Sequence, residues 1–350
     1  MPRIDQQLGV CFLGCGAMAE RHIRALRALA PKARIAVASR DGARARAFGL
    51  RLGIVETFDG YDAALRSDVE VMVIATPPRS HRALIEAALA EGKHLLIEKP
   101  VVSGLDELVA LWPTLTSATT TVMVAENDHF APFHRRLVDS LRVASLGRPL
   151  FLDLTRLGRA SPRGWRGDPS EMPLGALHEG GVHWIRRLMD LAGVYEDGRI
   201  DHVVELSAYG PSAPLTSTPG EDTTMIVARH RSGLTSRLLH TWALPWRFPP
   251  FDASKLLLEH GALYFDSRGL YARLYERRDG RWLLPALRDR SGLAAMWAHF
   301  LDCIEHERAP ELSLAHVFAD FAYLDAAYRA RASGMSVVPQ RAPKPAGGDG

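Results

Sequence analysis

Cysteine is scarce in this sequence, and the scarcity restricts both the compartment and the chemistry that we expect. Cys11, Cys15 and Cys303 are the only three cysteines among 350 residues. An odd and sparse set of thiols is typical of a reducing compartment, because a disulfide framework needs several matched pairs. No further Cys or His pair completes a ligand set with Cys11 and Cys15, so we expect no metal site and a cytoplasmic protein.

Long apolar runs and a strong excess of one charge are also lacking. No apolar run approaches the roughly 18 residues of a membrane-spanning helix, and the first ten residues contain no apolar stretch of the secretion-signal kind. The formal net charge is +3 with both signs interspersed, so neither nucleic acid nor a membrane surface is expected as a partner. A chain of 350 residues is long for a single core, which predicts two domains.

Residues 9–30 contain a strand, a glycine turn and a helix in immediate succession. The apolar residues 10–13 suit one buried strand, Gly14-Cys15-Gly16-Ala17-Met18-Ala19 follows as a tight turn, and a helical pattern then begins. Gly14 lets the chain turn sharply, and Gly16 lets the backbone approach a pyrophosphate that faces the amide groups of the new helix. The pattern predicts that Gly14, Gly16, Ala17 and Met18 bind a dinucleotide.

The first 128 residues continue this alternation of strand and helix. The expected strands cover residues 10–13, 34–38, 55–58, 69–75, 94–97 and 120–125, with helices over 41–52, 79–91 and 104–111. Six strands with intervening helices predict a doubly wound parallel sheet, the Rossmann architecture of α/β proteins, for a domain over residues 1–128.

Beyond residue 128 short strands and turn signals dominate. The expected strands cover residues 149–157, 203–209, 223–230, 234–242, 253–259, 262–266 and 270–276, with helices over 133–141, 179–191, 294–306 and 314–331. This pattern predicts an α+β domain over residues 129–340 with a large, mainly antiparallel open sheet, followed by a disordered tail over 341–350. Because a large open sheet needs one face covered, we expect a homodimer or homotetramer formed through it.

The end of the second strand indicates which dinucleotide fits. An NAD site usually has Asp or Glu about 20 residues beyond the glycine turn, where it binds the ribose 2′-hydroxyl. This chain has Ser39-Arg40-Asp41 there, with Arg44 one turn further on. Arg40 suits a 2′-phosphate and Ser39 can donate to it, which favours NADP and leaves NAD possible. Alternatively, Asp41 caps the next helix and both arginines are solvated surface charges.

Four segments together carry a specific resemblance. They are Gly14-Cys15-Gly16-Ala17-Met18-Ala19, Ala75-Thr76-Pro77-Pro78 with His81, Glu98-Lys99-Pro100, and Glu179-Gly180-Gly181-Val182-His183-Trp184. In this order and spacing, the sequence resembles the Gfo/Idh/MocA family of NAD(P)-dependent oxidoreductases over nearly its whole length. The resemblance implies a Rossmann domain, a C-terminal α/β domain with an open sheet, and hydride transfer at a sugar, inositol or related carbinol.

The candidate cofactor residues beyond the glycine turn follow the strands of the expected sheet. Ligands of such sheets bind at the carboxyl ends of the strands, where Thr76-Pro77-Pro78 and Glu98-Lys99 lie. Asn127 follows the sixth strand, where it can contact the nicotinamide ribose or the substrate, or simply cap the strand. The expected cofactor-binding set is completed by Ser39, Arg40, Thr76, Pro77, Pro78, His81, Glu98, Lys99 and Asn127.

Alcohol oxidation needs a base for the hydroxyl proton and a cation that stabilises the developing alkoxide. In the family's pattern the matching lysine and histidine are the catalytic pair, which assigns these roles to Lys99 and His183. Glu179 stands four residues before His183, where the family more commonly has Asp. Its role as a third catalytic or substrate-binding residue is open between orienting His183, contacting substrate hydroxyls and assisting proton transfer.

The loop around Trp165 and Arg166 is a second candidate for substrate contact. A flat Trp face suits a sugar ring, and Arg166 suits a carboxylate or phosphate, although Trp165 can equally serve only to anchor the loop. The expected substrate-binding set is Lys99, Asn127, Trp165, Arg166, Glu179 and His183. Trp242 and Trp246 are compatible with core, pocket or oligomer contacts.

Three functions remain open at this point. The first is an oxidoreductase, with NADP favoured, that interconverts a secondary hydroxyl and a ketone on a sugar, polyol or related small molecule. The second is a non-catalytic, dinucleotide-sensing regulatory protein of the same fold, which the presence of both Lys99 and His183 disfavours. The third is an enzyme that uses bound NAD(P) for elimination or hydrolysis through a transient ketone, without net change in the cofactor.

Overall fold

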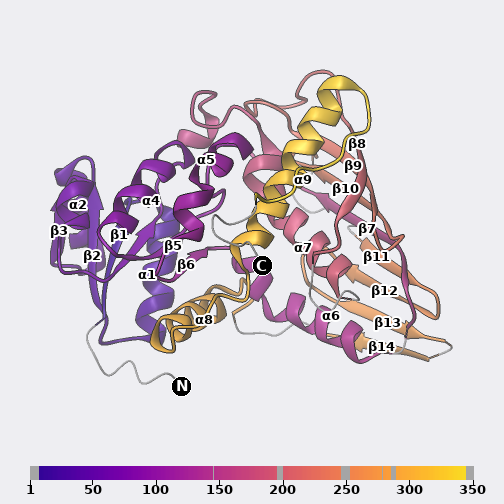
Figure 1. Cartoon of the computed structure of the whole chain (residues 1–350), viewed down its shortest axis with the longest axis horizontal. Coiled ribbons are helices and arrows are strands. Elements are labelled where there is room, and N and C mark those ends of the chain that lie inside the picture. Colours follow the sequence, from indigo (N-terminus) through magenta and orange to yellow (C-terminus); the bar gives the residue numbers. More distant parts are fainter. Residues whose placement is uncertain are drawn as a thin grey trace. The chain divides into compact units, whose positions relative to one another are not determined.

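The structure is a computed structural model that describes residues 8–144, 146–194, 200–245, 253–277, 279–284 and 289–343. Within those ranges the chain divides into two compact units (Figure 1). The first contains residues up to 127 together with 293–317 and 342–343, and the second contains residues 128–292 and 318–341. Trp246 and residues 344–350 of the expected tail lie outside the described residues.

The first unit contains a six-stranded parallel sheet in the order β3-β2-β1-β4-β5-β6. Its strands are β1 (Gly9–Leu13), β2 (Arg34–Ser39), β3 (Glu56–Asp59), β4 (Val71–Ile74), β5 (His94–Ile97) and β6 (Val122–Val124). Every residue of β1 and β4 is buried, as expected for continuous apolar runs covered by helices on both faces. The predicted doubly wound parallel sheet is confirmed.

Helices connect these strands close to the predicted positions. They are α1 (Ala17–Leu29), α2 (Gly42–Leu52), α4 (His81–Ala90) with the short 3₁₀ turn η1 (Pro78–Ser80), and α5 (Leu105–Thr116). Helix α3 (Tyr61–Leu65) was not predicted, because it is too short for a recognisable apolar period.

The last part of the first unit comes from the C-terminal third of the chain. Helix α8 (Leu293–Glu305) packs against α1, although the sequence analysis had included its residues in a continuous second domain over 129–340. The ring of Trp297, which is fully buried, lies 6.2 Å from that of Phe12 in β1 and 5.9 Å from that of Phe300. These long-range apolar contacts place the helix with the Rossmann unit, and periodicity along the sequence cannot show them. The first boundary, between 127 and 128, lies one residue from the predicted one.

The second unit contains an eight-stranded sheet in the order β14-β13-β12-β11-β7-β10-β9-β8. Its strands are β7 (Pro149–Leu157), β8 (Val203–Tyr209), β9 (Thr223–His230), β10 (Thr235–Thr241), β11 (Ala253–Leu258), β12 (Gly261–Asp266), β13 (Ala272–Glu276) and β14 (Asp279–Leu283). Among the described strand pairs of this sheet only β7–β10 is parallel, so the prediction of a large and mainly antiparallel sheet is confirmed. The sequence analysis missed β14, whose residues alternate less clearly.

Helices cover one face of this sheet, as Figure 1 shows for the second unit. They are α6 (Pro132–Val143), α7 (Val182–Gly193) and α9 (Leu314–Ser333), and their apolar side chains form one core with the inward residues of the strands. The opposite face carries exposed aromatic side chains, with Phe151 56% and Trp282 58% exposed. None of the described helices is both long and apolar enough to cross a bilayer.

Candidate functional site

The glycine turn after β1 is shaped by the close approach of β4. Gly14 has a φ angle of +115°, which favours glycine, and its amide donates to the Ala38 carbonyl at 2.9 Å. A Cβ at this position would lie 2.6 Å from the carbonyl oxygen of Ala75. No other residue fits there without displacing backbone, so Gly14 is required for the turn itself.

Gly16 differs from Gly14 in both its backbone and its surroundings. It is the N-cap residue of α1 with an ordinary φ of −103°, and no side chain caps the helix there. A Cβ at Gly16 would meet no protein atom within 4 Å, so the position faces open space. The first amide groups of α1, from Ala17 and Met18 onward, therefore border a space that suits a pyrophosphate, and these residues fit the dinucleotide of the expected site.

The end of β2 carries the residues that were expected to select the cofactor. Ser39 is buried, and its hydroxyl accepts a hydrogen bond from the Asp41 amide at 3.3 Å, while Arg40 and Arg44 are exposed. Asp41 caps α2 by accepting from the amides of Ala43 and Arg44, as the alternative interpretation expected. The neighbouring acid, Asp59, accepts from the Gly42 amide at 3.0 Å. Asp41 and Asp59, the carboxylates near the expected position of the ribose, therefore already accept hydrogen bonds from amides at the start of α2.

The loops after β4 and β5 are joined through a buried histidine. His81 is fully buried, with Nε2 2.8 Å from the Thr76 carbonyl oxygen and Nδ1 3.2 Å from that of Val101. Burial lowers the pKa of His81, and the two carbonyls only partly offset this effect. The imidazole thus connects the Thr76-Pro77-Pro78 turn to the chain that follows Pro100, and any part it has in cofactor binding is through these loops.

Glu98 and Lys99 follow β5 at the same edge of the sheet. The Glu98 side chain is buried, and one of its carboxylate oxygens accepts the backbone amide of Lys99 at 3.1 Å. The other oxygen lies 2.7 Å from Nε2 of His22, a fully buried residue of α1. Lys99 is half-buried, and so is Asn127, which begins the 3₁₀ turn η2 (Asn127–Phe130) after β6.

The second unit brings three predicted substrate residues into direct contact. Glu179 lies in the π-helical turn η4 (Leu177–Gly181), and its Oε1 accepts from Nε of Arg166 at 2.7 Å. The Arg166 guanidinium also lies over the Trp165 ring, 4.4 Å from its centroid. Arg166 and Trp165 belong to the 3₁₀ turn η3 (Gly164–Gly167), so the ion pair ties this loop to the helix that carries Glu179. His183 is half-buried in the first turn of α7, directly after η4.

A buried polar network supports η4 through hydrogen bonds to its backbone. Glu221 accepts from the Leu177 amide at 2.6 Å and from the Tyr328 hydroxyl at 3.0 Å. Burial raises the pKa of Glu221, although these donors act in the opposite direction. The same turn also packs against an indole. A Cβ at Gly180 would lie 2.9 Å from the Trp242 ring, so glycine is needed at this contact.

The structure therefore groups the predicted residues by unit. Those of the cofactor set follow the carboxyl ends of β1, β2, β4, β5 and β6, while Trp165, Arg166, Glu179 and His183 belong to the second unit. Four features of the site were not predicted: His22, Glu221, Tyr328 and the position of Trp242 against Gly180. A signal existed for His22, because it shares a face of α1 with the buried residues Ala19, Ile23 and Leu26.

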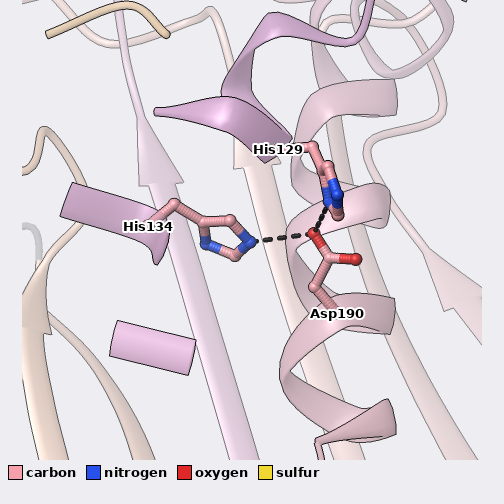
Figure 2. A group of neighbouring side chains, drawn as sticks. All are labelled: His129, His134 and Asp190. Atoms are coloured by element: carbon pink, nitrogen blue, oxygen red, sulfur yellow. Dashed lines mark hydrogen bonds and ion pairs between the residues drawn. The ribbon is translucent and has the colours of Figure 1, made fainter. Parts of the chain in front are cut away.

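Three further side chains with metal-ligating atoms converge within the described part of the second unit (Figure 2). Nδ1 of His129 and Nε2 of His134 each lie 2.8 Å from Oδ2 of Asp190, and the ligand atoms lie within 4.8 Å of one another. Arg186 donates to the other Asp190 oxygen at 3.0 Å and pairs with Asp320 at 3.1 Å. No metal site was expected from the sequence, and this cluster was not foreseen, because Asp190 lies 56 residues beyond His134.

Charge and hydrogen bonding account for the cluster without a metal ion. Burial alone would raise the pKa of Asp190, but Arg186 and the two imidazoles hold it well below its usual range. The ionised carboxylate can only accept, so each imidazole donates through the nitrogen that faces it. Because the Arg186 guanidinium already supplies a positive charge beside Asp190, we interpret the cluster as a hydrogen-bonded link between η2, α6 and α7.

Replacing Asp190 tests this interpretation. In an Asp190→Asn variant the buried Arg186 loses part of its compensation, so we expect the free energy of unfolding to fall by about 3 kcal/mol. Urea denaturation measures the change, and Asp139→Asn on α6, whose side chain is 68% exposed, is the matched control with an expected change below about 0.5 kcal/mol.

Zinc provides the complementary measurement on the wild-type protein. If hydrogen bonds and Arg186 satisfy Asp190, neither ZnCl₂ nor EDTA should change the thermal midpoint. A midpoint that rises with zinc and is lost in Asp190→Asn would contradict the interpretation and identify the cluster as a metal site.

Comparison with known proteins agrees with this geometry. Residues 8–126 match the model of an oxidoreductase family with an NAD-binding Rossmann fold, GFO_IDH_MocA. D-apiose dehydrogenase of Paraburkholderia graminis is 28% identical over 232 residues, which cover 64% of this chain and 58% of that protein. An NADP(+)-dependent D-xylose 1-dehydrogenase of Haloferax volcanii is 35% identical over 105 residues, or 30% of this chain and 32% of that protein. The matches thus span less than two thirds of these curated relatives.

A solved structure extends the similarity in fold to the second unit. Levoglucosan dehydrogenase, in a complex with NADH and levoglucosan, superposes with a TM-score of 0.84 at 23% identity, covering 96% of this chain and all of that chain. At this identity the likeness concerns the fold alone. Residues 8–126 are thus similar to the NAD-binding Rossmann domain of the GFO_IDH_MocA oxidoreductase family.

Proposed function

We propose that this protein is an oxidoreductase, with a preference for NADP, that transfers a hydride between the nicotinamide and a secondary hydroxyl or ketone of a sugar, polyol or related small molecule. The observation that carries the proposal is the glycine turn, where Gly14 is forced by the Ala75 carbonyl and Gly16 leaves space at the start of α1. The curated relatives named above act on sugars, which supports this substrate class.

In the proposed reaction a dinucleotide supplies the acceptor or donor of the hydride when it is bound. The amide groups at the start of α1 bind the pyrophosphate, while the Thr76-Pro77-Pro78 turn presents a rigid surface after β4. The Ser80 hydroxyl oxygen lies 2.8 Å from the Thr76 hydroxyl oxygen and 2.9 Å from the Pro77 carbonyl oxygen, so this turn is held from within. The fixed loops lower the cost of ordering the site when a ligand binds.

Lys99 and His183 share the remaining chemistry in our proposal. Oxidation removes a proton from the substrate oxygen and a hydride from its carbon, so one group takes the proton and a positive charge stabilises the alkoxide. We assign these tasks to His183 and Lys99, with Glu179 and Arg166 as contacts for substrate hydroxyls. The ion pair between Glu179 and Arg166 fixes both side chains before a substrate arrives.

The preference for NADP rests on the charges at the end of β2. Asp41 and Asp59 accept hydrogen bonds from the amides of α2, while Arg40 and Arg44 are exposed beside them. A 2′-phosphate would bind two guanidinium groups there. For a 2′-hydroxyl, the two described carboxylates nearby, Asp41 and Asp59, already accept hydrogen bonds from amides.

We also propose that the protein is a homodimer or homotetramer formed through the outer face of the eight-stranded sheet. That face alternates ion pairs with aromatic rings, since Arg237 donates to Asp153 at 2.8 Å and Arg273 lies 5.0 Å from the ring centroid of Trp282. Phe151, in the same strand as Asp153, is more than half exposed. Large exposed aromatic groups on an open sheet are typical of an interface.

Removal of the lysine amine is the first test of the catalytic assignment. Lys99→Ala should lower kcat/KM by about 30-fold or more, equivalent to about 2 kcal/mol of transition-state stabilisation, with the Kd for NADPH nearly unchanged. Steady-state assays with a panel of sugars and polyols measure it. Lys93→Ala, on the residue before β5, is the control, and wild-type activity in Lys99→Ala would rule out the assignment.

Reversal of the charge at residue 40 tests the cofactor preference. Arg40→Asp should weaken NADPH binding about tenfold or more, because a charge-assisted hydrogen bond is replaced by repulsion, while NADH binding changes little. Fluorescence titrations with each cofactor measure both affinities, with the exposed Arg46→Asp on α2 as the control. Equal losses for NADPH and NADH would remove the argument for the 2′-phosphate.

The outer face of the sheet can be tested without any substrate. Size-exclusion chromatography with light scattering should give a dimer or tetramer for the wild type and a smaller species for Phe151→Asp combined with Trp282→Asp. Val55→Asp changes an exposed residue of the first unit and should leave the mass unchanged. A monomeric wild type would refute the proposed assembly.

A further inference from the structure

We propose that His22 and Trp297 are positioning residues that hold the Glu98 carboxylate and, through it, the backbone of Lys99. Both belong to a continuous chain of hydrogen bonds that runs from the indole of Trp297 to the amide of Lys99. The inference rests on the proposed role of Lys99 in catalysis. It gives a function to His22 and Trp297, which belong to none of the predicted sets of site residues.

The direction of each hydrogen bond follows from the donors available. The indole N–H of Trp297 can only donate, so Nδ1 of His22, at 3.0 Å, accepts. Its Nε2 therefore carries the proton in neutral imidazole and donates to Oε1 of Glu98 at 2.7 Å. Oε2 of Glu98 then accepts the Lys99 amide at 3.1 Å. Trp297 and Glu98 thus favour the same neutral tautomer of His22, with the proton on Nε2.

Burial makes each member of this chain dependent on the others. His22 and Trp297 are fully buried and Glu98 is 6% exposed, so water cannot readily replace a lost partner. Without the indole donor, Nδ1 of His22 would be buried with no donor facing it, and the imidazole would be held on its Glu98 side alone. Loss of one hydrogen bond would therefore disturb the next one, up to the backbone of Lys99.

This series of hydrogen bonds also connects α1 with the end of β5, two segments whose separation must stay fixed in the proposed reaction. His22 belongs to α1, the helix whose first turn borders the expected pyrophosphate, and Glu98 follows β5 and precedes Lys99. The Glu98 amide donates to the Ile74 carbonyl at 2.9 Å, which ties the residue to the end of β4 as well. The link therefore holds Lys99 at a constant distance from the helix that binds the cofactor.

Trp297 provides both apolar and polar contacts between α8 and the rest of the first unit. It lies 275 positions from His22 in the sequence, and its ring packs against Phe12 and Phe300 while its N–H reaches the imidazole. Phe300 contacts the same indole ring without donating a hydrogen bond, so it shares the packing of Trp297 but not its polar role. This pair of neighbours allows the two contributions to be separated by mutation.

The kinetic test compares Trp297→Phe with Phe300→Leu, and adds His22→Phe. In Trp297→Phe and His22→Phe we expect kcat to fall about tenfold with the KM for NADPH changed less than about twofold, because the lysine is displaced while the glycine turn is intact. Phe300→Leu, which keeps the hydrogen bonds, should keep kcat near the wild-type value at a similar loss of thermal stability. Equal effects in all three variants would reduce the role to packing and overturn the proposal.

A second measurement follows the histidine itself and needs no turnover. In protein labelled with ¹⁵N-histidine, the resonances that disappear in His22→Phe identify His22, and their pattern distinguishes protonation on Nε2 from that on Nδ1. We expect the Nε2–H tautomer in the wild type and in Phe300→Leu, and in Trp297→Phe a shift of the Nδ1 resonance, because Nδ1 loses the hydrogen bond that it accepts from the indole. An Nδ1–H tautomer in the wild type, or an Nδ1 resonance that is unchanged in Trp297→Phe, would overturn the inferred series of hydrogen bonds.

The two measurements separate this inference from the proposed function. If Lys99→Ala retains full activity while the tautomer behaves as expected, the catalytic role of Lys99 is wrong and the hydrogen-bonded chain remains as a structural feature. If Lys99→Ala is impaired but Trp297→Phe and His22→Phe keep the wild-type kcat, the lysine stays catalytic and the positioning role is refuted.

Discussion

The carbonyl of Ala75 occupies the space that a side chain at residue 14 would need, and the site of the first unit depends on this close approach. Gly14 turns the chain at the end of β1, so that α1 begins beside the end of β4. Parallel strands place their carboxyl ends at one edge, where the loops after β4, β5 and β6 then gather. The turn, the Thr76-Pro77-Pro78 segment and Lys99 are therefore consequences of one sheet topology.

Buried polar side chains, rather than loop backbone alone, hold these segments in place. His81 bridges the loops after β4 and β5, the Trp297–His22–Glu98 chain bridges α8, α1 and β5, and Glu221 supports the turn that carries Glu179. In each case a donor or acceptor that water cannot reach requires a partner from a distant segment. The same requirement accounts for Asp190, which binds two imidazoles and Arg186.

Each unit contributes a different kind of residue to the function proposed here. The first supplies amide groups and a cation at the edge of a parallel sheet, which suit a charged dinucleotide. The second supplies an ion pair, a histidine and an indole next to helical turns, which suit a polar ring with several hydroxyl groups. Variation of the second set would change the substrate without altering the first, as expected where function is carried by sites rather than by folds.

Local patterns in the sequence determined most of the fold. Apolar runs and glycine signals located all six parallel strands and seven of the eight strands of the open sheet, because period and turn chemistry are local properties. Motifs with their spacing were enough to suggest the family and the positions of Lys99, Glu179 and His183.

Only the tertiary structure decided which distant side chains meet. Nothing in the neighbourhood of Trp297 indicates that its indole binds His22, and residues 129, 134 and 190 share no motif. The assignment of α8 to the first unit has the same origin, since its apolar face is compatible with either core until the chain is folded. Local sequence specifies how a segment bends and which face it buries, whereas partners in a buried network are chosen by the packing of the whole unit.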